Sequence, residues 1–273
     1  MQGLGNDYIY FDLTDGKELP ISLNELSKKL SDRHFGIGGD GIVLIQKSDV
    51  ADARMRMFNA DGSEGKMCGN AIRCVGKYLY ENNIVKSQSI EVETLSGIKR
   101  LEINVVSGRV DSVTVNMGKP DFCTEHIPVN AYVKAAIDYP LTVLGKEYKI
   151  NCVSMGNPHC VVFTDNLEFD IEKIGRAFEN NKIFPDRVNT EFVKIIDKDK
   201  FGMRVWERGS GETMACGTGA SAVAAVAEVK GLIEKNKEVQ VVLHGGTLGI
   251  TVTEAGVLMR GAAEKVFDGE IEI

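Results

Sequence analysis

The stretch Thr213-Met214-Ala215-Cys216-Gly217-Thr218-Gly219-Ala220 decides the fold, because it leads a cysteine directly into a helix. The following run, Ala220 to Val229, is rich in alanine and has no proline, which predicts a helix with a glycine-rich entry turn. Cys216 therefore stands at a helix N-terminus. The peptide dipoles and unpaired N–H groups there favour a thiolate over a thiol, and the same N–H groups can bind a carboxylate.

The same pattern occurs a second time, nearer the N-terminus. Gly62-Ser63-Glu64-Gly65-Lys66-Met67-Cys68-Gly69 precedes a second helix-forming run, Ala71 to Tyr80. The two cysteines, at 68 and 216, are 148 residues apart. Further matches follow in the same order at similar spacing, and they pair Gly5-Asn6 with Gly156-Asn157, Arg33 with Arg187, and Ser96-Gly97 with Gly245-Gly246. The sequence therefore predicts two halves of one repeated design.

The bulk composition limits the classes of function. A length of 273 residues with 43% hydrophobic residues suits two domains of ordinary size or one large domain. The net charge of -7 and the lack of a Lys/Arg block argue against a nucleic-acid partner. No apolar run approaches the roughly 20 residues that span a bilayer. The first residues show no secretory signal, so we expect a cytoplasmic protein without a membrane partner.

The cysteines and histidines do not suggest a metal site. Six cysteines without a secretory signal are expected to be reduced thiols. None forms a C-x-x-C pair and the four histidines are scattered, so no metal is expected. Cys74, Cys123, Cys152 and Cys160 are interpreted as small core residues, whereas the duplicated context favours chemistry for Cys68 and Cys216.

Each half reads as several strands and a central small-residue helix, which predicts an α+β fold with the helix enclosed by its sheet. An amphipathic helix is predicted over 21–30, and a second helix over about 171–180. Gly36-Ile37-Gly38-Gly39-Asp40-Gly41 satisfies G-x-G-x-x-G. A helix precedes it and a strand, Ile42 to Ile45, follows, which is the reverse of the dinucleotide-binding order. These glycines are expected instead to turn the backbone tightly or to approach a ligand.

Two thiols at facing helix N-termini can do what one thiol cannot. If the halves face each other across a pseudo-twofold axis, Cys68 and Cys216 lie on opposite sides of one cleft. One thiolate can then take a proton from one face of a carbon while the other thiol donates a proton to the opposite face. Stereochemical inversion results, and the helix ends stabilise the carboxylate beside that carbon.

Several motifs together resemble the diaminopimelate epimerase family over nearly the whole chain. They are Gly3-Leu4-Gly5-Asn6-Asp7, Phe58 to Glu64, Cys68-Gly69-Asn70-Ala71-Ile72-Arg73-Cys74, Met155-Gly156-Asn157-Pro158-His159, Arg187 to Phe192, and Trp206 to Gly219. The resemblance implies cofactor-independent epimerisation of LL-2,6-diaminopimelate to the meso isomer, on the route to lysine and peptidoglycan. It also suggests a homodimer.

The resemblance also assigns roles to residues. It implies that Cys68 and Cys216 are the acid/base pair, that His159 lies beside them, and that Glu207 receives the reacting ammonium. The remaining residues are expected around the substrate, and they are Asn6, Asn59, Gly69, Asn70, Asn157, Asn189, Arg208, Gly217 and Thr218. Asn and Arg suit an amino-acid head group. Many relatives carry a substrate-binding Gln where this chain has Gly41, so that contact must be absent or replaced.

The resemblance further implies two pseudo-symmetric domains, each a strongly curved, mostly antiparallel sheet wrapped around a central helix. Residues 1–118 are expected to form the half that carries Cys68, completed by a C-terminal strand at about 264–273. Residues 119–263 are expected to form the half that carries Cys216.

Other readings of the same residues remain open at this point. A proline or hydroxyproline racemase would also use two cysteines, but it has less need for a second anchor built from Asn59, Asn189 and Arg208. A redox protein would join Cys68 and Cys216 in a reversible disulfide. Taken alone, His159 could be a packing residue and Glu207-Arg208 an exposed ion pair.

Overall fold

A computed structural model describes residues 1–272, and the chain divides into two compact units. The first, here the N-unit, consists of Met1–Asn116 together with the segment from Arg260 onward. The second, here the C-unit, is Met117–Met259. The boundaries lie a few residues before the positions 118 and 263 expected from the sequence.

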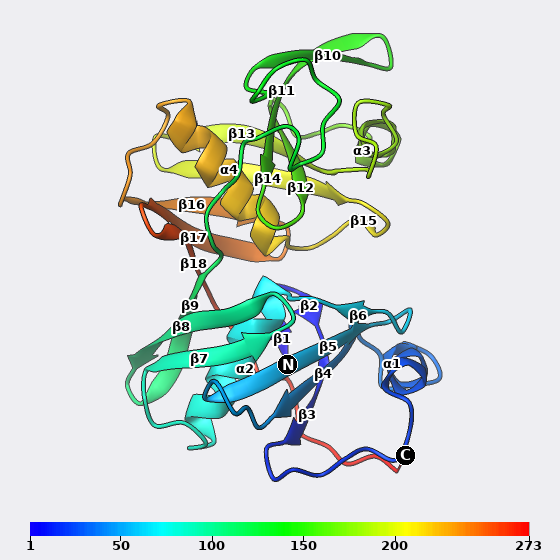
Figure 1. The fold of residues 1–273 in the computed structure, drawn as a ribbon, viewed down its shortest axis with the longest axis vertical. Coiled ribbons are helices and arrows are strands. Elements are labelled where there is room, and N and C mark those ends of the chain that lie inside the picture. The colour runs from blue at the N-terminus through cyan, green and yellow to red at the C-terminus, as the bar shows by residue number, and fades with distance from the viewer. Residues whose placement is uncertain (273) are drawn as a thin grey trace. The chain divides into compact units, whose positions relative to one another are not determined.

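The N-unit is built on one sheet with the strand order β9-β8-β7-β5-β4-β3, and β6 pairs with β5 (Figure 1). Only the β3/β4 and β5/β7 pairs are parallel. Its elements are β1 (Gln2–Gly3), β2 (Asn6–Asp7), β3 (Ile9–Leu13), α1 (Leu23–Ser31), β4 (Gly41–Gln46), β5 (Ala53–Asn59), β6 (Glu64–Gly65), α2 (Gly69–Glu81), β7 (Ser89–Thr94), β8 (Gly97–Val106) and β9 (Arg109–Asn116).

The C-unit has the strand order β10-β11-β12-β13-β14-β16-β17-β18, and β15 pairs with β14. Its parallel pairs are β12/β13 and β14/β16. Its elements are β10 (Tyr139–Val143), β11 (Lys146–Ser154), β12 (Pro158–Phe163), α3 (Ile171–Glu179), β13 (Asn189–Asp197), β14 (Lys200–Glu207), β15 (Gly211–Glu212), α4 (Gly217–Val229), β16 (Glu238–Leu243), β17 (Gly246–Thr253) and β18 (Gly256–Gly261).

The strand pairings repeat between the two units. In the N-unit, β3/β4 is parallel, β4/β5 and β5/β6 are antiparallel, and β5/β7 is parallel. The C-unit repeats these orientations in the same order, in β12/β13, β13/β14, β14/β15 and β14/β16. The helix α1 follows β3 as α3 follows β12, and α2 follows β6 as α4 follows β15. The sequence repeat is thus matched by a repeat in hydrogen-bonded topology.

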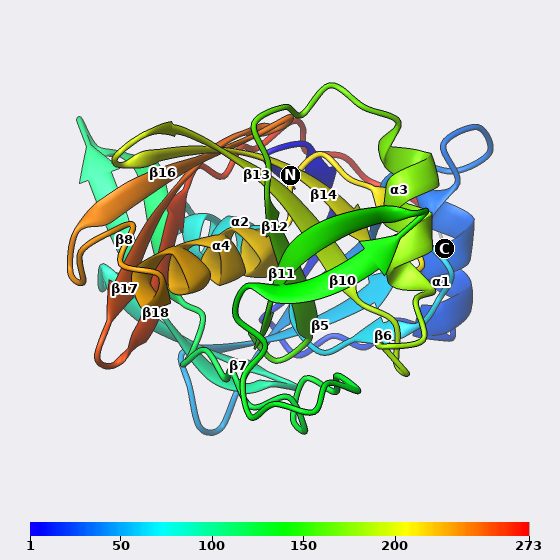
Figure 2. The same ribbon diagram turned by 90° about the horizontal axis from the view of Figure 1, so that it is seen from above.

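In each unit the sheet encloses the helix that begins after a cysteine (Figures 1 and 2). Every residue of α4 from Gly219 to Ala227 is buried, and α4 packs against β11, β12, β13 and β17. Small side chains permit this close approach. In α2, a Cβ on Gly76 would lie 2.9 Å from Leu101 Cδ1 of β8, so the glycine lets the helix sit close to its sheet without displacing that side chain.

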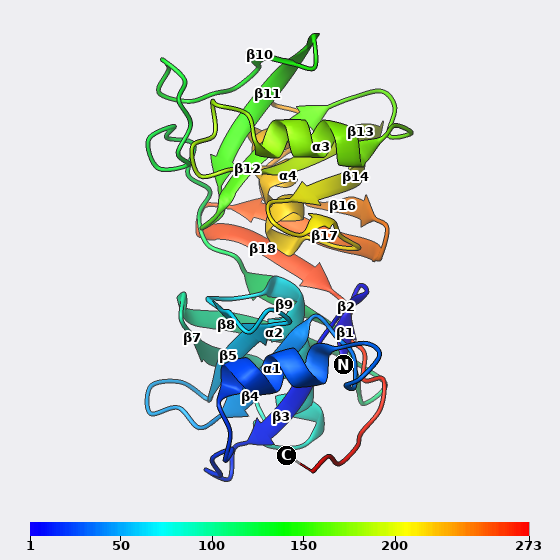
Figure 3. The ribbon, with the colours of Figure 1, turned by 90° about the vertical axis from the view of Figure 1, so that its right-hand side faces the viewer.

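The second helix of each unit lies on the other side of the same sheet (Figure 3). In the N-unit, Leu26 and Leu30 of α1 pack on Ile42 and Leu44 of β4 and on Phe58 of β5. This amphipathic packing is what the apolar spacing predicts. The α+β class with a central helix in each curved sheet is confirmed. The glycine loop from Gly36 runs from α1 into β4, so it does not have the strand-then-helix context of a dinucleotide site.

The C-terminal segment differs from the expectation. The segment from Arg260 onward does belong to the N-unit, and Gln2 and Glu264 exchange two backbone hydrogen bonds of 2.9 Å. Residues 265–272, however, form no strand. The reason is the short partner, because β1 has only two residues and offers little edge to pair with. Arg73 adds a side-chain anchor by donating from Nε to Ala262 O at 3.2 Å.

Gly41, the first residue of β4, has a backbone position that excludes a side chain. Its φ is 155°, and a Cβ there would lie 2.0 Å from Phe58 O and 2.8 Å from Tyr8 Cε1. No side chain fits here without a shift of the backbone. We predict that Gly41→Ala lowers the free energy of unfolding by about 3 kcal/mol, measured by urea denaturation.

Gly97→Ala is the matched control for Gly41→Ala. Gly97 also has a positive φ, of 89°, but a Cβ there would meet nothing within 4 Å. Only the backbone strain remains, and it costs about 1 kcal/mol. Equal losses of stability in the two variants would contradict the steric explanation.

Candidate active site

The N-unit places Cys68 at the N-cap of α2, where the sequence predicts it. The Cys68 thiol is half-buried and donates to Asn6 Oδ1 at 3.2 Å. Asn70, in the first turn of α2, donates from Nδ2 to the same oxygen at 3.4 Å. The motif that contains Asn6 and the motif that contains Cys68 therefore meet, although 62 residues separate them. We refer to Asn6, Cys68, Gly69 and Asn70 as the N half-site.

A hydrogen-bonded network of charged side chains orients the Asn6 amide. Its Nδ2 donates to Asp40 Oδ2 at 2.6 Å, which turns Oδ1 toward Cys68. Burial raises the pKa of Asp40, opposed by the hydrogen bond from Asn6. Arg33 holds Asp7 with two hydrogen bonds of 2.7 and 3.0 Å and reaches Asp40 at 3.2 Å. Asp40 of the glycine loop thus orients Asn6 of the N half-site.

Asn59 ends β5 and faces the turn that follows it. Its Nδ2 donates to Ser63 Oγ at 3.0 Å, and its backbone N–H donates to Ser63 O at 2.9 Å. These bonds fix Asn59 as a turn residue.

The C-unit places Cys216 at the N-cap of α4, where it is buried. Its sulfur accepts from Gly219 N at 3.4 Å and lies 3.5 Å from Thr218 Oγ1. A Cβ on Gly219 would lie 3.3 Å from the sulfur and 2.7 Å from Glu191 Oε1. Glycine at 219 therefore lets a carboxylate and a thiol share the first turn of α4.

The effect of the helix N-terminus on Cys216, which favours the thiolate, is opposed by burial. Burial raises the pKa of the Cys216 thiol well above its ordinary value of 9.0, and the carboxylates of Glu207 and Glu191 raise it further. The hydrogen bonds from Thr218 and Gly219 act in the opposite direction and do not offset these effects. Cys216 is consequently a thiol at neutral pH.

Asn157, His159 and Glu191 form a hydrogen-bonded chain next to Cys216. His159 Nδ1 lies 2.7 Å from Glu191 Oε1, and Nε2 lies 3.0 Å from Asn157 Oδ1. Asn157 Nδ2 donates to Thr218 Oγ1 at 3.4 Å. Thr218 thus connects this chain to the sulfur of Cys216. We refer to the residues of this chain, with Cys216, Gly217 and Thr218, as the C half-site.

The turn after β14 presents Glu207 and Arg208. Glu207 accepts a hydrogen bond from Thr213 Oγ1. Asn189 Oδ1 accepts from Arg208 N at 2.9 Å, and the Arg208 guanidinium donates to Asp186 O at 2.9 Å. Each of the two residues therefore has its own hydrogen-bond partner in the C-unit.

A buried carboxylate, Glu179 of α3, holds this turn in place. It accepts from Trp206 Nε1 at 2.7 Å, from Gly209 N at 2.9 Å and from Arg187 at 3.1 Å. These three donors come from β14, from the turn and from the loop before β13. Glu179, Trp206 and Gly209 also line a hollow of about 400 Å³ beside the turn.

Sequence reasoning gave no role to Glu179, Glu191 or Asp40. A signal existed for Glu191, because it is a charged residue among the apolar residues of a predicted strand. Such a residue is expected to be paired when it is buried. Glu179 carries no comparable signal, because a glutamate at the end of an amphipathic helix is ordinary.

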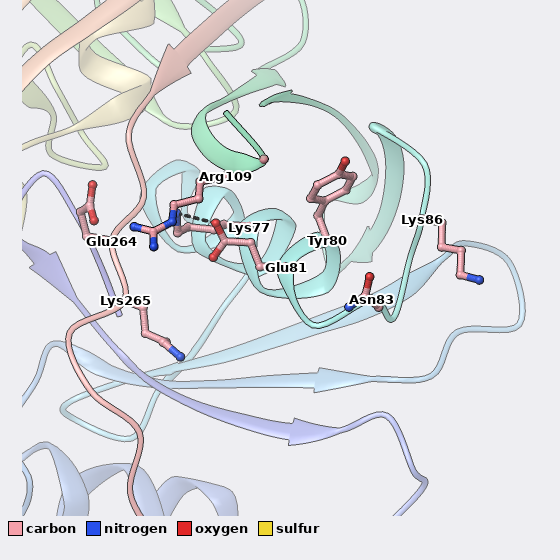
Figure 4. Close-up of a pocket in the computed structure, with 9 residues that line it drawn as sticks. Lys77, Tyr80, Glu81, Asn83, Lys86, Arg109, Glu264 and Lys265 are labelled. Carbon is pink, nitrogen blue, oxygen red and sulfur yellow. Dashed lines mark hydrogen bonds and ion pairs between the residues drawn. The ribbon is translucent and has the colours of Figure 1, made fainter. Parts of the chain in front are cut away.

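A second polar hollow, of about 620 Å³, lies in the N-unit away from the N half-site (Figure 4). Lys77 and Glu81 of α2, which form an ion pair of 3.0 Å, line it together with Arg109 and Glu264. These α2 residues lie in the last turns of the helix, at the opposite end from Cys68. The hollow therefore has no part in the chemistry of the cysteines.

The structure records six free cysteines, and only Cys68 and Cys216 stand at helix N-caps. Cys74, Cys152 and Cys160 are buried and Cys123 is half-buried. Within residues 1–272 no cluster of three or more His, Cys, Asp or Glu side chains could hold a metal ion. No helix in that range is long and apolar enough to cross a membrane.

Solved structures share this fold at low sequence identity. A hydroxyproline epimerase from Agrobacterium vitis matches with a TM-score of 0.63 and 16% identity, over 95% of this chain and 86% of that one. A phenazine biosynthesis protein from Enterococcus faecalis matches with a TM-score of 0.65 and 16% identity, over 97% and 92%. At this identity the matches describe the fold alone.

Sequence comparison is more specific. The diaminopimelate epimerase family model matches residues 1–123 and 151–266. A diaminopimelate epimerase from Acetivibrio thermocellus is 50% identical over 276 residues, which cover 100% of this chain and 97% of the relative. One from Methanococcus maripaludis is 51% identical over 277 residues, with 100% and 98% coverage. The chain belongs to the diaminopimelate epimerase family.

Proposed function

We propose that this protein interconverts LL- and meso-2,6-diaminopimelate without a cofactor. The observation that carries the proposal is the duplication of one half-site, in which a Cys-Gly pair begins a buried helix beside an asparagine from a Gly-Asn motif. Family membership supports diaminopimelate as the substrate, because relatives that are about 50% identical over the whole chain are named diaminopimelate epimerase. A homodimeric assembly and a cytoplasmic location stay predictions.

The reaction needs one thiolate and one thiol on opposite faces of an α-carbon. We assign the proton donor to Cys216 in the direction that begins with LL-diaminopimelate, because burial and the carboxylate of Glu207 favour its protonated form. Cys68 is then the base that removes the α-proton. The reverse reaction exchanges the two roles, as microscopic reversibility requires. For this chemistry the N and C half-sites must act on one substrate molecule.

The charges around the C half-site suit the reacting end of an amino acid. Glu207 would accept the substrate ammonium, which would neutralise one of the carboxylates that hold the proton on Cys216. The first-turn N–H groups of Gly69-Asn70 and Gly217-Thr218 would bind the carboxylate. These donors are fixed before the reaction, so they stabilise the negative charge that develops when the α-proton leaves.

The non-reacting end of the substrate requires its own anchor. We propose that Asn157, Asn189 and Arg208 provide it in the C-unit, together with Asn6 and Asn59 in the N-unit. Arg208 suits the distal carboxylate, because a guanidinium can bind it through two parallel hydrogen bonds. A proline-type substrate has no such group, so a second amino-acid head is the better match to these side chains.

The central test is incubation of the reduced protein with LL-diaminopimelate in deuterated water. We expect the meso isomer to form with deuterium at the inverted carbon. Chiral chromatography separates the isomers, and mass spectrometry measures the deuterium. Cys68→Ala and Cys216→Ala should each lose about 10²–10⁴-fold in turnover. Cys123→Ala, at a half-buried cysteine away from both helix N-caps, is the control and should keep normal turnover.

Other outcomes of this test point to the alternative functions. Inversion of L-proline but not of diaminopimelate would indicate a proline-type racemase. No inversion and no deuterium with either substrate, with the thiols reduced, would favour a redox role for Cys68 and Cys216.

A second prediction concerns the protonation of Cys216. Its raised pKa means that Cys216 carries no thiolate between about pH 7 and pH 9, where an ordinary cysteine titrates. The ultraviolet absorbance of thiolate, compared between the wild type and Cys216→Ser, should therefore show no difference in this range. A difference that appears with a midpoint below about pH 8 would contradict the assignment of Cys216 as the donor.

A third prediction concerns the distal anchor. Arg208→Lys removes the two-pronged donor while keeping the charge, so we expect KM for diaminopimelate to rise about tenfold or more. The matched control is Arg176→Lys, since Arg176 is exposed on α3 and pairs with Glu172 at 3.0 Å. An unchanged KM in Arg208→Lys would remove Arg208 from the proposed anchor.

A further inference from the structure

His159 and Glu191 form a completely buried pair on neighbouring parallel strands. Both side chains have 0% of their surface exposed, and His159 Nδ1 lies 2.7 Å from Glu191 Oε1. On its other side His159 Nε2 lies 3.0 Å from Asn157 Oδ1. The family resemblance gave His159 a general place beside the cysteines but assigned nothing to Glu191.

The distances restrict where the protons can be. Asn157 Oδ1 can only accept a hydrogen bond, so His159 Nε2 must carry a hydrogen. The 2.7 Å contact between Nδ1 and Glu191 Oε1 then needs a second proton, bound either to the imidazole or to the carboxyl group. The pair therefore holds two protons in total and is electrically neutral.

The surroundings of Glu191 favour this neutral state. Among the described residues nothing donates to its second oxygen, Oε2, which an isolated buried carboxylate would require. Burial raises the pKa of Glu191, His159 opposes that effect, and the carboxylate of Glu207 on β14 adds to it. The other titratable groups nearby are Cys160 on β12 and Cys216 at the start of α4. An ionised Glu191 beside neutral His159 would add a negative charge to a site that already contains Glu207.

We propose that Glu191 is a positioning residue for Asn157, acting through His159. The shared proton keeps Nε2–H donating to Asn157 Oδ1, so the Asn157 NH₂ group points away from His159, toward Thr218 and the substrate. Loss of that proton would leave Nε2 as an acceptor and turn the amide round, presenting its oxygen to the substrate instead. Only the NH₂ group can donate to a carboxylate.

The proposal rests on the proposed function for the identity of the substrate, but its first test does not. The ¹⁵N chemical shifts of the His159 ring are measured in the substrate-free protein between about pH 7 and pH 9, and the His159→Gln variant identifies the signals. We expect Nε2 to stay protonated throughout. A bare Nε2 with a hydrogen on Nδ1 would overturn the proposal, whatever the epimerase assay shows.

Two variants then separate positioning from packing. In Glu191→Gln the side-chain NH₂ can donate to Nδ1, so Nε2 should keep its hydrogen and KM should stay within about threefold of the wild type. In Glu191→Leu the partner of Nδ1 is lost, so KM for diaminopimelate should rise about tenfold or more while kcat changes less.

The two Glu191 variants can also overturn the proposal. A folded Glu191→Leu protein with KM within about twofold of the wild type would overturn the positioning role, as would a Gln variant in which Nε2 loses its hydrogen. If Glu191→Leu does not fold, the Gln variant and the wild-type ring shifts still decide the question. Glu172→Gln, at an exposed glutamate of α3, is the control for loss of a carboxylate and should leave both measurements unchanged.

Discussion

The N-terminus of a helix that is buried on every side sets the requirements for the rest of each unit. Cys216 caps α4 with a sulfur 3.4 Å from the nearest N–H, and sulfur is a weak acceptor compared with the oxygen of Ser or Asp. The remaining first-turn N–H groups are therefore not satisfied by the cap itself. In a helix whose body is enclosed by sheet, such groups need a polar partner, and an anionic ligand is the natural one.

Enclosure of the helix explains the composition around it. A strongly curved sheet can approach α4 only where the side chains are small, so the run after Cys216 consists largely of Ala and Val. The same constraint acts on α2, where Gly76 faces Leu101 of β8. The small residues that predict the helices are thus the same residues that allow the sheet to enclose them. This is why the two halves and their enclosed helices could be inferred from the Cys-Gly motifs and their spacing, while the curved sheets were implied by the family resemblance.

The parts that sequence could not provide come from residues that are distant in the chain. The helix-dipole argument for a Cys216 thiolate used only neighbouring residues. The pKa of Cys216 is raised first by burial and then by carboxylates on β13 and β14, which are distant in the chain. The partner of His159 is set by the parallel register of β12 and β13, which the sequence does not state. Likewise the backbone of Phe58 excludes a side chain at Gly41, and the two-residue β1 leaves the C-terminal segment without a strand to pair with.

The duplicated half-sites have the same topology but different electrostatic surroundings. Beside Cys68 stands the neutral amide of Asn6, fixed by Asp40, whereas beside Cys216 stand Glu207 and the His159–Glu191 pair. Two identical thiols would compete for one proton, and neither direction of an inversion would have a defined starting state.

The different neighbours remove that ambiguity, because they hold the proton on Cys216 before substrate binds. The polar groups proposed to contact substrate are also held by second residues, as Asn6 is by Asp40, Asn157 by His159 and the Arg208 backbone by Asn189. Their orientation is therefore set before binding, so less conformational entropy is lost when the substrate arrives. In the proposed reaction, the duplication would provide the two thiols that inversion needs, and the different neighbours would set which thiol carries the proton when LL-diaminopimelate binds.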